Sequence, residues 1–313
     1  MNDAVDGGAA FEDPGFEDPV FEDTAFEETL FKDPAFEQVG FDEGTAGRKD
    51  AAAKEAERRA EALEAVLAAP ADLPSWLRPL ATAVQRLEPG WLGFQPRVRT
   101  LPGEPRRSAV LILFGGAEGE TRPDILITER AATLRAHAGQ PAFPGGRIDP
   151  EDPGPVHAAL REAQEETGVD PASVSVFGRL PEIYLQPSDF MVASVLGWWH
   201  TPSPPRVVSP LEVAAVHRVS VAELTDPGNR LRVRHPSGYS GPAFHADGML
   251  VWGFTAGLLD AVLRLGGWER PWDRDRLEDL PEEVNALAVR SSSIRPADQR
   301  PFAAGSDGSD GGK

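Results

Sequence analysis

Three glutamates stand close together in one short stretch of the chain: Glu162, Glu165 and Glu166. If this stretch is helical, a rotation of about 100° per residue places the three carboxylates on one face. Carboxylates on one face repel one another, so the face is either a solvated surface or a site for a hard cation. Mg²⁺ and Mn²⁺ prefer oxygen ligands and usually share them with the phosphates of a substrate. The carboxylates alone leave both interpretations open.

The residues around the glutamates predict the helix that positions them. Residues 141–146 (PAFPGG) form a loop, because proline fixes φ and glycine tolerates positive φ. Asp152 is expected as the N-cap with Pro153 at the first helical position, and Gly168 is expected to end the helix. The apolar side of this helix would consist of Val156, Leu160, Ala163 and Thr167.

A wider pattern surrounds the glutamates. Gly145 and Gly146 come first, Asp152 follows, and the run from Arg161 reads REAQEETGV. This arrangement resembles the Nudix box, the loop–helix–loop signature of Nudix hydrolases. Two departures are visible: the acidic residue six positions after Gly146 is aspartate rather than glutamate, and one extra residue separates it from Arg161.

A second pattern lies upstream of the box. Leu126 to Gly146 reads LITERAATLRAHAGQPAFPGG, with Arg130, Arg135 and His137 among its polar residues. It is similar to the signature of the coenzyme A diphosphatase branch of the Nudix family, which also has the lengthened box. The resemblance extends more loosely over the middle of the chain and includes the segment VWGFTA at 251–256.

The resemblance implies an α/β/α sandwich with a mixed sheet, and it implies roles for individual residues. Glu162, Glu165 and Glu166 are expected to bind Mg²⁺ or Mn²⁺ with the backbone of Gly146, and Glu165, Glu166 and Arg161 to act in catalysis. We expect Arg161 to pair with Glu165, four residues later, rather than with substrate. The predicted substrate-binding residues are Arg130, Arg135 and His137, since the planar guanidinium fork suits phosphates.

The water-activating base stays open at this stage. One of the box glutamates could serve, as could a carboxylate or histidine from a later loop, and Glu212 is one candidate. We expect Asp152 to be structural rather than a metal ligand. His137 and the two arginines could also be ordinary surface residues.

Three functions follow from these patterns. The first is metal-dependent hydrolysis of the diphosphate in coenzyme A or its thioesters, which gives 3′,5′-ADP and a 4′-phosphopantetheine species. The second is hydrolysis of another nucleoside diphosphate derivative, such as ADP-ribose or NADH. The third is a catalytically weak nucleotide-binding module, which the intact glutamates oppose.

Composition excludes several other classes of function. The formal net charge of −19 argues against nucleic acid or an anionic membrane as the main partner, and a small-molecule substrate is expected instead. The chain has no cysteine, so disulfides, thiol nucleophiles and zinc–thiolate sites are excluded. No signal peptide or long apolar run is recognisable, which favours a cytoplasmic protein. A homodimer stays open.

The first 46 residues form a segment of their own. Phenylalanine recurs there every five residues between positions 11 and 41, and 14 acidic residues accompany one lysine. A period of five matches neither helix nor strand, so we expect a disordered acidic tail. Its phenylalanines, within residues 11–44, could dock on a protein partner.

The remaining chain divides into three parts. Residues 47–90 are expected to form a helical extension, with Pro79 delaying the start of its second helix. Residues 91–275 are predicted to be the Nudix hydrolase domain, and residues 276–313 a charged, mostly disordered tail. Strands are predicted at residues 108–114, 124–128, 173–185, 190–199, 213–219 and 231–235, and helices at residues 221–224 and 252–265.

Overall fold

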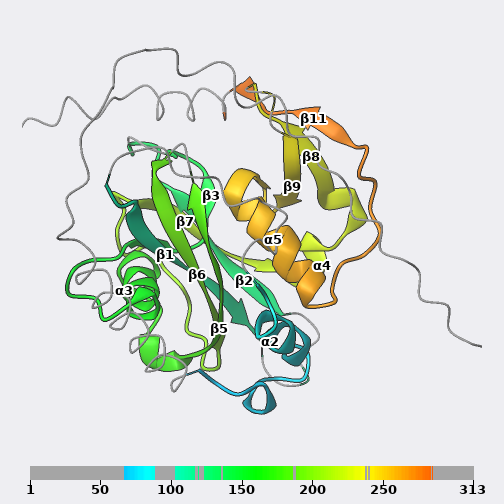
Figure 1. Ribbon diagram of the computed structural model, residues 1–313. Coiled ribbons are helices and arrows are strands. Elements are labelled where there is room, and N and C mark those ends of the chain that lie inside the picture. The colour runs from blue at the N-terminus through cyan, green and yellow to red at the C-terminus, as the bar shows by residue number, and fades with distance from the viewer. Residues whose placement is uncertain are drawn as a thin grey trace, which may run out of the picture.

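The computed structural model describes residues 67–88 and 103–284, apart from residues 117–118, 120–122, 135–136, 186–187, 237, 239 and 283 (Figure 1). The strands are β1 (Arg106–Gly115), β2 (Asp124–Arg130), β3 (Pro141–Ala142), β4 (Gly145–Arg147), β5 (Val174–Leu185), β6 (Phe190–Trp199), β7 (Val213–Ser220), β8 (Arg230–Arg234), β9 (Ser240–Ala246), β10 (Met249–Val251) and β11 (Leu277–Asp279). The α-helices are α2 (Arg78–Val84), α3 (Pro155–Thr167), α4 (Val221–Leu224) and α5 (Gly253–Leu265), and short 3₁₀ turns lie at Pro70–Asp72, Pro171–Ser173 and Pro227–Asn229.

The larger sheet is built around β1. This strand pairs in parallel with β6 along its whole length, and β5 adds to β6 in the antiparallel direction. On the other side of β1, β2 pairs only near the end of the strand, at Phe114 and Gly115. The short strand β4 pairs with the beginning of β1 instead, and β3 with β2, whose outer edge carries β7. The sheet is therefore mixed, as predicted.

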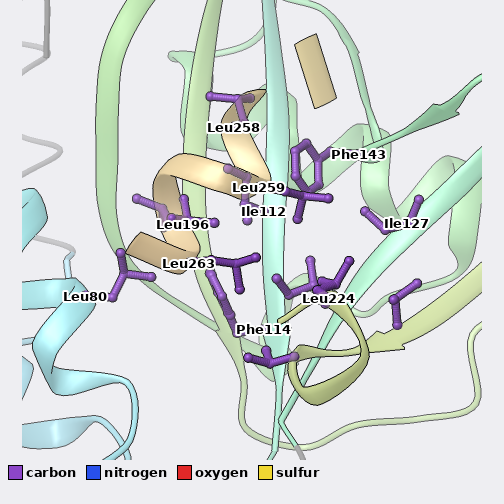
Figure 2. Close-up of a cluster of buried hydrophobic side chains, with 14 of the residues drawn as sticks. Leu80, Ile112, Phe114, Ile127, Phe143, Leu196, Leu224, Leu258, Leu259 and Leu263 are labelled. Atoms are coloured by element: carbon purple, nitrogen blue, oxygen red, sulfur yellow. The ribbon is translucent and has the colours of Figure 1, made fainter. Parts of the chain in front are cut away.

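The alternation of side chains along β1 creates two hydrophobic cores. Ala109, Leu111 and Leu113 pack with residues of α3, whereas Ile112 and Phe114 pack with residues of α5. The two helices lie on opposite sides of the sheet in Figure 1, and Figure 2 shows the core on the α5 side. Because successive side chains of a strand point to opposite faces, one apolar run serves both layers. The predicted α/β/α sandwich is confirmed.

A second sheet, ordered β10–β9–β8–β11, packs beside α5. Apolar residues of β9 and β10 share a core with α5, and the fully buried Arg230 on β8 ion-pairs with Asp260 of α5 and with Glu269. The last strand, β11, pairs in parallel with β8, and Leu280 after it is buried. The folded region therefore continues past the predicted boundary at residue 275.

The N-terminal extension packs on the main domain where the structure describes it. Helix α2 begins at Arg78 with Pro79 in its first turn, which agrees with the delayed start expected from that proline. Its buried residues Leu80, Ala81 and Val84 join the core on the α5 side. The predicted acidic tail (1–46) and residues 47–66 of the predicted first helix (47–69) lie outside the described residues, and residues 67–69 are not helical. None of the described helices is long and apolar enough to cross a membrane.

The predicted helix of the box, α3, ends as expected but begins later. Gly168 adopts the left-handed conformation at the C-terminal end, with φ 72°. The N-cap is Gly154 and the first helical residue is Pro155, so the prediction that Asp152 caps the helix is wrong. Asp152 instead accepts hydrogen bonds from Arg161, which hold it in the loop before the helix.

Candidate active site

Two glycines of β4, which belong to the segment predicted as a loop, let this strand approach its surroundings closely. A Cβ atom on Gly145 would lie 2.3 Å from the carbonyl oxygen of Ala109 on β1. A Cβ atom on Gly146 would lie 2.4 Å from the carboxyl carbon of Glu162. Only glycine permits these contacts. As a result the Glu162 carboxyl group lies directly against the Gly146 backbone.

Glu166 is the most deeply buried of the three glutamates, with 3% of its surface exposed. Its Oε2 accepts a hydrogen bond of 3.1 Å from the backbone N–H of Gly145. Burial raises the pKa of Glu166 to about 7, although the Gly145 bond and the charge of Arg130 oppose that rise. The carboxylates of Glu162 and Glu212 raise the pKa of Glu166 further.

Glu162 is partly buried, with 15% of its side chain exposed. Burial raises its pKa, and the charge of Arg161, 3.0 Å away, opposes the rise. The neighbouring carboxylates Glu165 and Glu212 act in the same direction as burial. The charge of Glu212 therefore acts on both Glu162 and Glu166, although Glu212 is far from them in the sequence.

Arg161 connects the helix to the loop that precedes it. Its Nη1 lies 3.1 Å from Glu165 Oε2, so the expected pair is present. Its Nε and Nη2 donate to the two oxygens of Asp152 at 3.1 and 2.9 Å, and Nη2 also donates to the carbonyl of Arg147 at 3.1 Å. The arginine lowers the pKa of Asp152 through these hydrogen bonds. Asp152 is therefore structural, as expected, but as the partner of Arg161.

The upstream signature meets the box through Arg130. On β2, Leu126 packs in the core on the α3 side, and Arg130 is the last residue of the strand, where its pairing with β7 is irregular. The positive charge of Arg130 favours the ionised form of Glu166. Its Nε is buried and has no hydrogen-bond partner among the described residues, which marks a donor available to a ligand.

The rest of the signature forms a closed loop after β2. The N–H of Gly139 donates to the carbonyl of Arg130, and the N–H of Arg130 donates to the carbonyl of Gln140. Within this loop His137 has φ 57°, and its Nδ1 lies 3.0 Å from Oε1 of Gln140. The predicted substrate ligand Arg135 lies outside the described residues.

A later loop, residues 201–212, contacts both the C-terminal end of α3 and the upstream signature. The N–H groups of Arg206 and Val208 each donate at 3.0 Å to the last carbonyls of α3, those of Thr167 and Glu166. Helix ends leave such carbonyls without an intrahelical partner, so the loop satisfies them. At its end, the carbonyl of Glu212 accepts from the N–H of Ala131 at 2.8 Å.

The donor set fits a hard divalent cation, although the side chains are not arranged around one. Among the described residues, no three acidic, histidine or cysteine side chains are close enough together to hold an ion. Glu165 is engaged with Arg161 and Glu166 with Gly145. The available donors are all oxygens, two of the carboxylates are buried with raised pKa values, and the Gly146 backbone lies against one of them. A bound cation would relieve the repulsion among these groups.

The chain is similar to known proteins over this region. The family model of the NUDIX domain matches residues 105–239. A protein of Cronobacter sakazakii named uncharacterized Nudix hydrolase NudL is 40% identical over 174 residues, which cover 53% of this chain and 85% of that protein. The chain belongs to the Nudix hydrolase family. A NudL protein of Citrobacter koseri is 37% identical to this Nudix hydrolase over 187 residues, 55% of this chain and 89% of the relative.

Among solved structures, the Nudix hydrolase RenU of M. smegmatis is 16% identical, with a TM-score of 0.38, covering 55% of this chain and 92% of that chain. Nudix hydrolases act on phosphoric anhydride bonds with divalent metal ions, so this Nudix hydrolase is an enzyme of that class. The glutamate helix and both signatures fall within the matched residues.

Sequence reasoning missed three contacts of this site. It did not place Asp152 against Arg161, the Gly145 N–H against Glu166, or the loop of residues 201–212 against the end of α3. The sequence could have suggested the first contact, because Asp152 comes just before the helix and Arg161 lies in its second turn. The other two depend on strand pairing and gave no local signal.

Proposed function

We propose that this Nudix hydrolase cleaves the diphosphate of coenzyme A and its thioesters, with Mg²⁺ or Mn²⁺ as its cofactor. The products would be 3′,5′-ADP and a 4′-phosphopantetheine species. The main support is the position of Arg130. This residue belongs to the signature that resembles the coenzyme A branch, and its charge acts on Glu166 of the box. Substrate recognition and hydrolysis would then meet at one place.

A divalent cation would connect the carboxylates of the site with the diphosphate of the substrate. Glu162, Glu165 and Glu166 would hold the cation with the backbone of Gly146, whose carbonyl can approach because no side chain intervenes. When bound, a divalent cation supplies the positive charge that a diphosphate requires and polarises the attacking water. Arg161 holds the loop and the helix in register through Asp152 and Glu165.

The substrate phosphates would be bound from the side of the upstream signature. Arg130 offers a buried Nε that has no partner in the described part of the chain, and a guanidinium matches the geometry of phosphate oxygens. We assign Arg135 and His137 to the same role from their place in the signature. Positive charge at this position would also stabilise the charge that develops as the anhydride bond breaks.

Glu212 is the carboxylate best suited to accept the proton of the attacking water. Its charge acts on both Glu162 and Glu166, which supports a role for Glu212 in the same site. No hydrogen bond or ion pair within the described residues engages its side chain, whereas each of the three box glutamates has such a partner. A base needs a lone pair that no other group occupies, which favours Glu212 for this role.

Product analysis tests this function. The purified full chain would be incubated with Mg²⁺ or Mn²⁺ and with coenzyme A, acetyl-coenzyme A, ADP-ribose or NADH, and the products identified by mass. We expect 3′,5′-ADP and phosphopantetheine to appear fastest, and Glu166→Gln to slow their release by orders of magnitude. Faster cleavage of ADP-ribose or NADH would favour the second function. No cleavage of any compound would favour a binding module.

A further inference from the structure

Two exposed hydrophobic side chains lie at the edge of the candidate active site. Among the residues that the structure describes, three large hydrophobic side chains are exposed: Leu211 at 80%, Val208 at 42% and Leu277 at 37%. A single exposed leucine is ordinary on a protein surface. Here two of the three fall within four consecutive residues of the loop 201–212, which we call the rim loop.

The rim loop is held in place at both ends of this apolar pair. The N–H of Val208 donates to the carbonyl of Glu166 at 3.0 Å. After Leu211, the carbonyl of Glu212 accepts from Ala131, in the upstream signature, at 2.8 Å. The two apolar side chains are therefore carried on backbone that touches the helix of the box on one side and the signature on the other.

The loop is also ordered between these anchors. The N–H groups of Glu212 and Val213 both donate to the carbonyl of Ser209, at 3.0 and 2.9 Å, which makes a tight turn around Leu211. The side chain of Val208 lies beside Gly168, where an added Cβ would be 3.3 Å from one of its methyl groups. Leu211 belongs to none of the hydrophobic cores of the described structure, so its side chain does not stabilise the fold by packing in a core.

We propose that Leu211 and Val208 contact the apolar acyl chain at the end of the pantetheine arm of a coenzyme A thioester and so determine which acyl groups the enzyme prefers. This inference rests on the proposed function. The rim loop is hydrogen-bonded through Val208 to the backbone of Glu166, so a diphosphate bound at the box glutamates would lie beside this loop. The arm attached to that diphosphate must leave the site across its edge. Apolar side chains there gain free energy as they remove acyl methylenes from water.

The test compares acyl chain lengths in full-length protein. Values of kcat/KM would be measured for coenzyme A, acetyl-, butyryl- and octanoyl-coenzyme A in the wild type, Leu211→Ser and the control Leu277→Ser. Leu277 is the third exposed side chain and lies on β11 of the other sheet. We expect Leu211→Ser to lower the ratio of octanoyl-coenzyme A to coenzyme A by roughly five- to tenfold, through KM, since a buried methylene is worth about fourfold. Leu277→Ser should leave that ratio unchanged.

A second variant and the negative outcomes complete the test. Val208→Thr keeps the shape of the side chain but replaces a methyl by a hydroxyl, and it should lower the same ratio by a smaller factor. An unchanged ratio in Leu211→Ser, or an equal loss of kcat on every acyl length, would overturn the inference while coenzyme A hydrolysis itself stands. If the wild type does not cleave coenzyme A at all, the proposed function fails and the inference fails with it.

Discussion

The guanidinium of Arg161 donates two hydrogen bonds to the carboxylate of Asp152, from Nε to Oδ1 at 3.1 Å and from Nη2 to Oδ2 at 2.9 Å. These bonds join the second turn of the box helix to the loop before it. Such two-point pairs are stronger than single contacts and fix geometry as well as energy. The side chain of Asp152 is only 8% exposed, so solvent screens the pair little.

Loss of this pair should destabilise the fold. We expect Asp152→Asn to lower the free energy of unfolding by about 1–3 kcal/mol, because the partly exposed guanidinium of Arg161 loses its most buried charged partner. Urea denaturation measures this change. The control is Asp149→Asn: Asp149 lies 3.6 Å from the same arginine but is 54% exposed, so its loss should cost less than about 0.5 kcal/mol. Equal effects from the two variants would contradict the structural role of Asp152.

A methyl group at Gly146 should displace the Glu162 carboxyl group. An added Cβ would lie 2.4 Å from its carboxyl carbon, so Gly146→Ala forces that side chain to move. We expect kcat to fall by at least roughly tenfold and more Mg²⁺ to be needed for half-maximal activity. Gly154→Ala is the matched control, since a Cβ there meets nothing within 4 Å. If both variants keep full activity, the close approach at Gly146 is irrelevant to catalysis.

The stability of the metal-free protein should depend on pH through Glu166. Its pKa is about 7 in the folded chain, above the ordinary value of 4.5. A carboxyl group with a raised folded pKa gives stability that is complete below the unfolded value and is lost as the pH rises through the folded value. In EDTA we therefore expect the free energy of unfolding to fall by up to roughly 3 kcal/mol between pH 5 and 8.

Two comparisons isolate the contribution of Glu166 to this pH dependence. Glu166→Gln should remove most of the fall, whereas Glu165→Gln, whose side chain is 54% exposed, should retain it. Added Mg²⁺ should restore stability at pH 8, because a bound cation favours the ionised carboxylate. A wild type whose stability in EDTA is flat from pH 5 to 8 would refute the assigned burial effect.

Arg130 should act mainly on substrate binding. Arg130→Gln removes the charge and the buried Nε donor, and we expect KM for coenzyme A to rise by at least roughly tenfold. Arg234→Gln, on β8 of the second sheet, serves as the control because its side chain is 54% exposed and pairs only loosely with Asp279 at 3.5 Å. Steady-state kinetics on both variants would show the difference. An unchanged KM in Arg130→Gln would remove this residue from the substrate site.

Much of the fold could be predicted from local patterns. The runs that became β1, β6 and β7 are apolar and bounded by turn residues, and the end of α3 is signalled by Gly168. These signals are local, because strand and helix periodicity and glycine conformation act over a few residues. The start of α3 was predicted wrongly. Pro155 suits a first helical position as well as Pro153 does, and the side chain of Asp152 is taken by Arg161.

The amino-acid sequence by itself determined the chemistry that this Nudix hydrolase carries: three glutamates on one helix face, two glycines before them, and an arginine-containing signature upstream. Only the tertiary structure decided which groups meet. The end of β2 brings the charge of Arg130 to Glu166, and the hydrogen bonds of the rim loop bring the charge of Glu212 to the same carboxylate. Such contacts depend on strand pairing and loop packing between segments far apart in the chain, so they cannot be predicted from any short stretch of sequence.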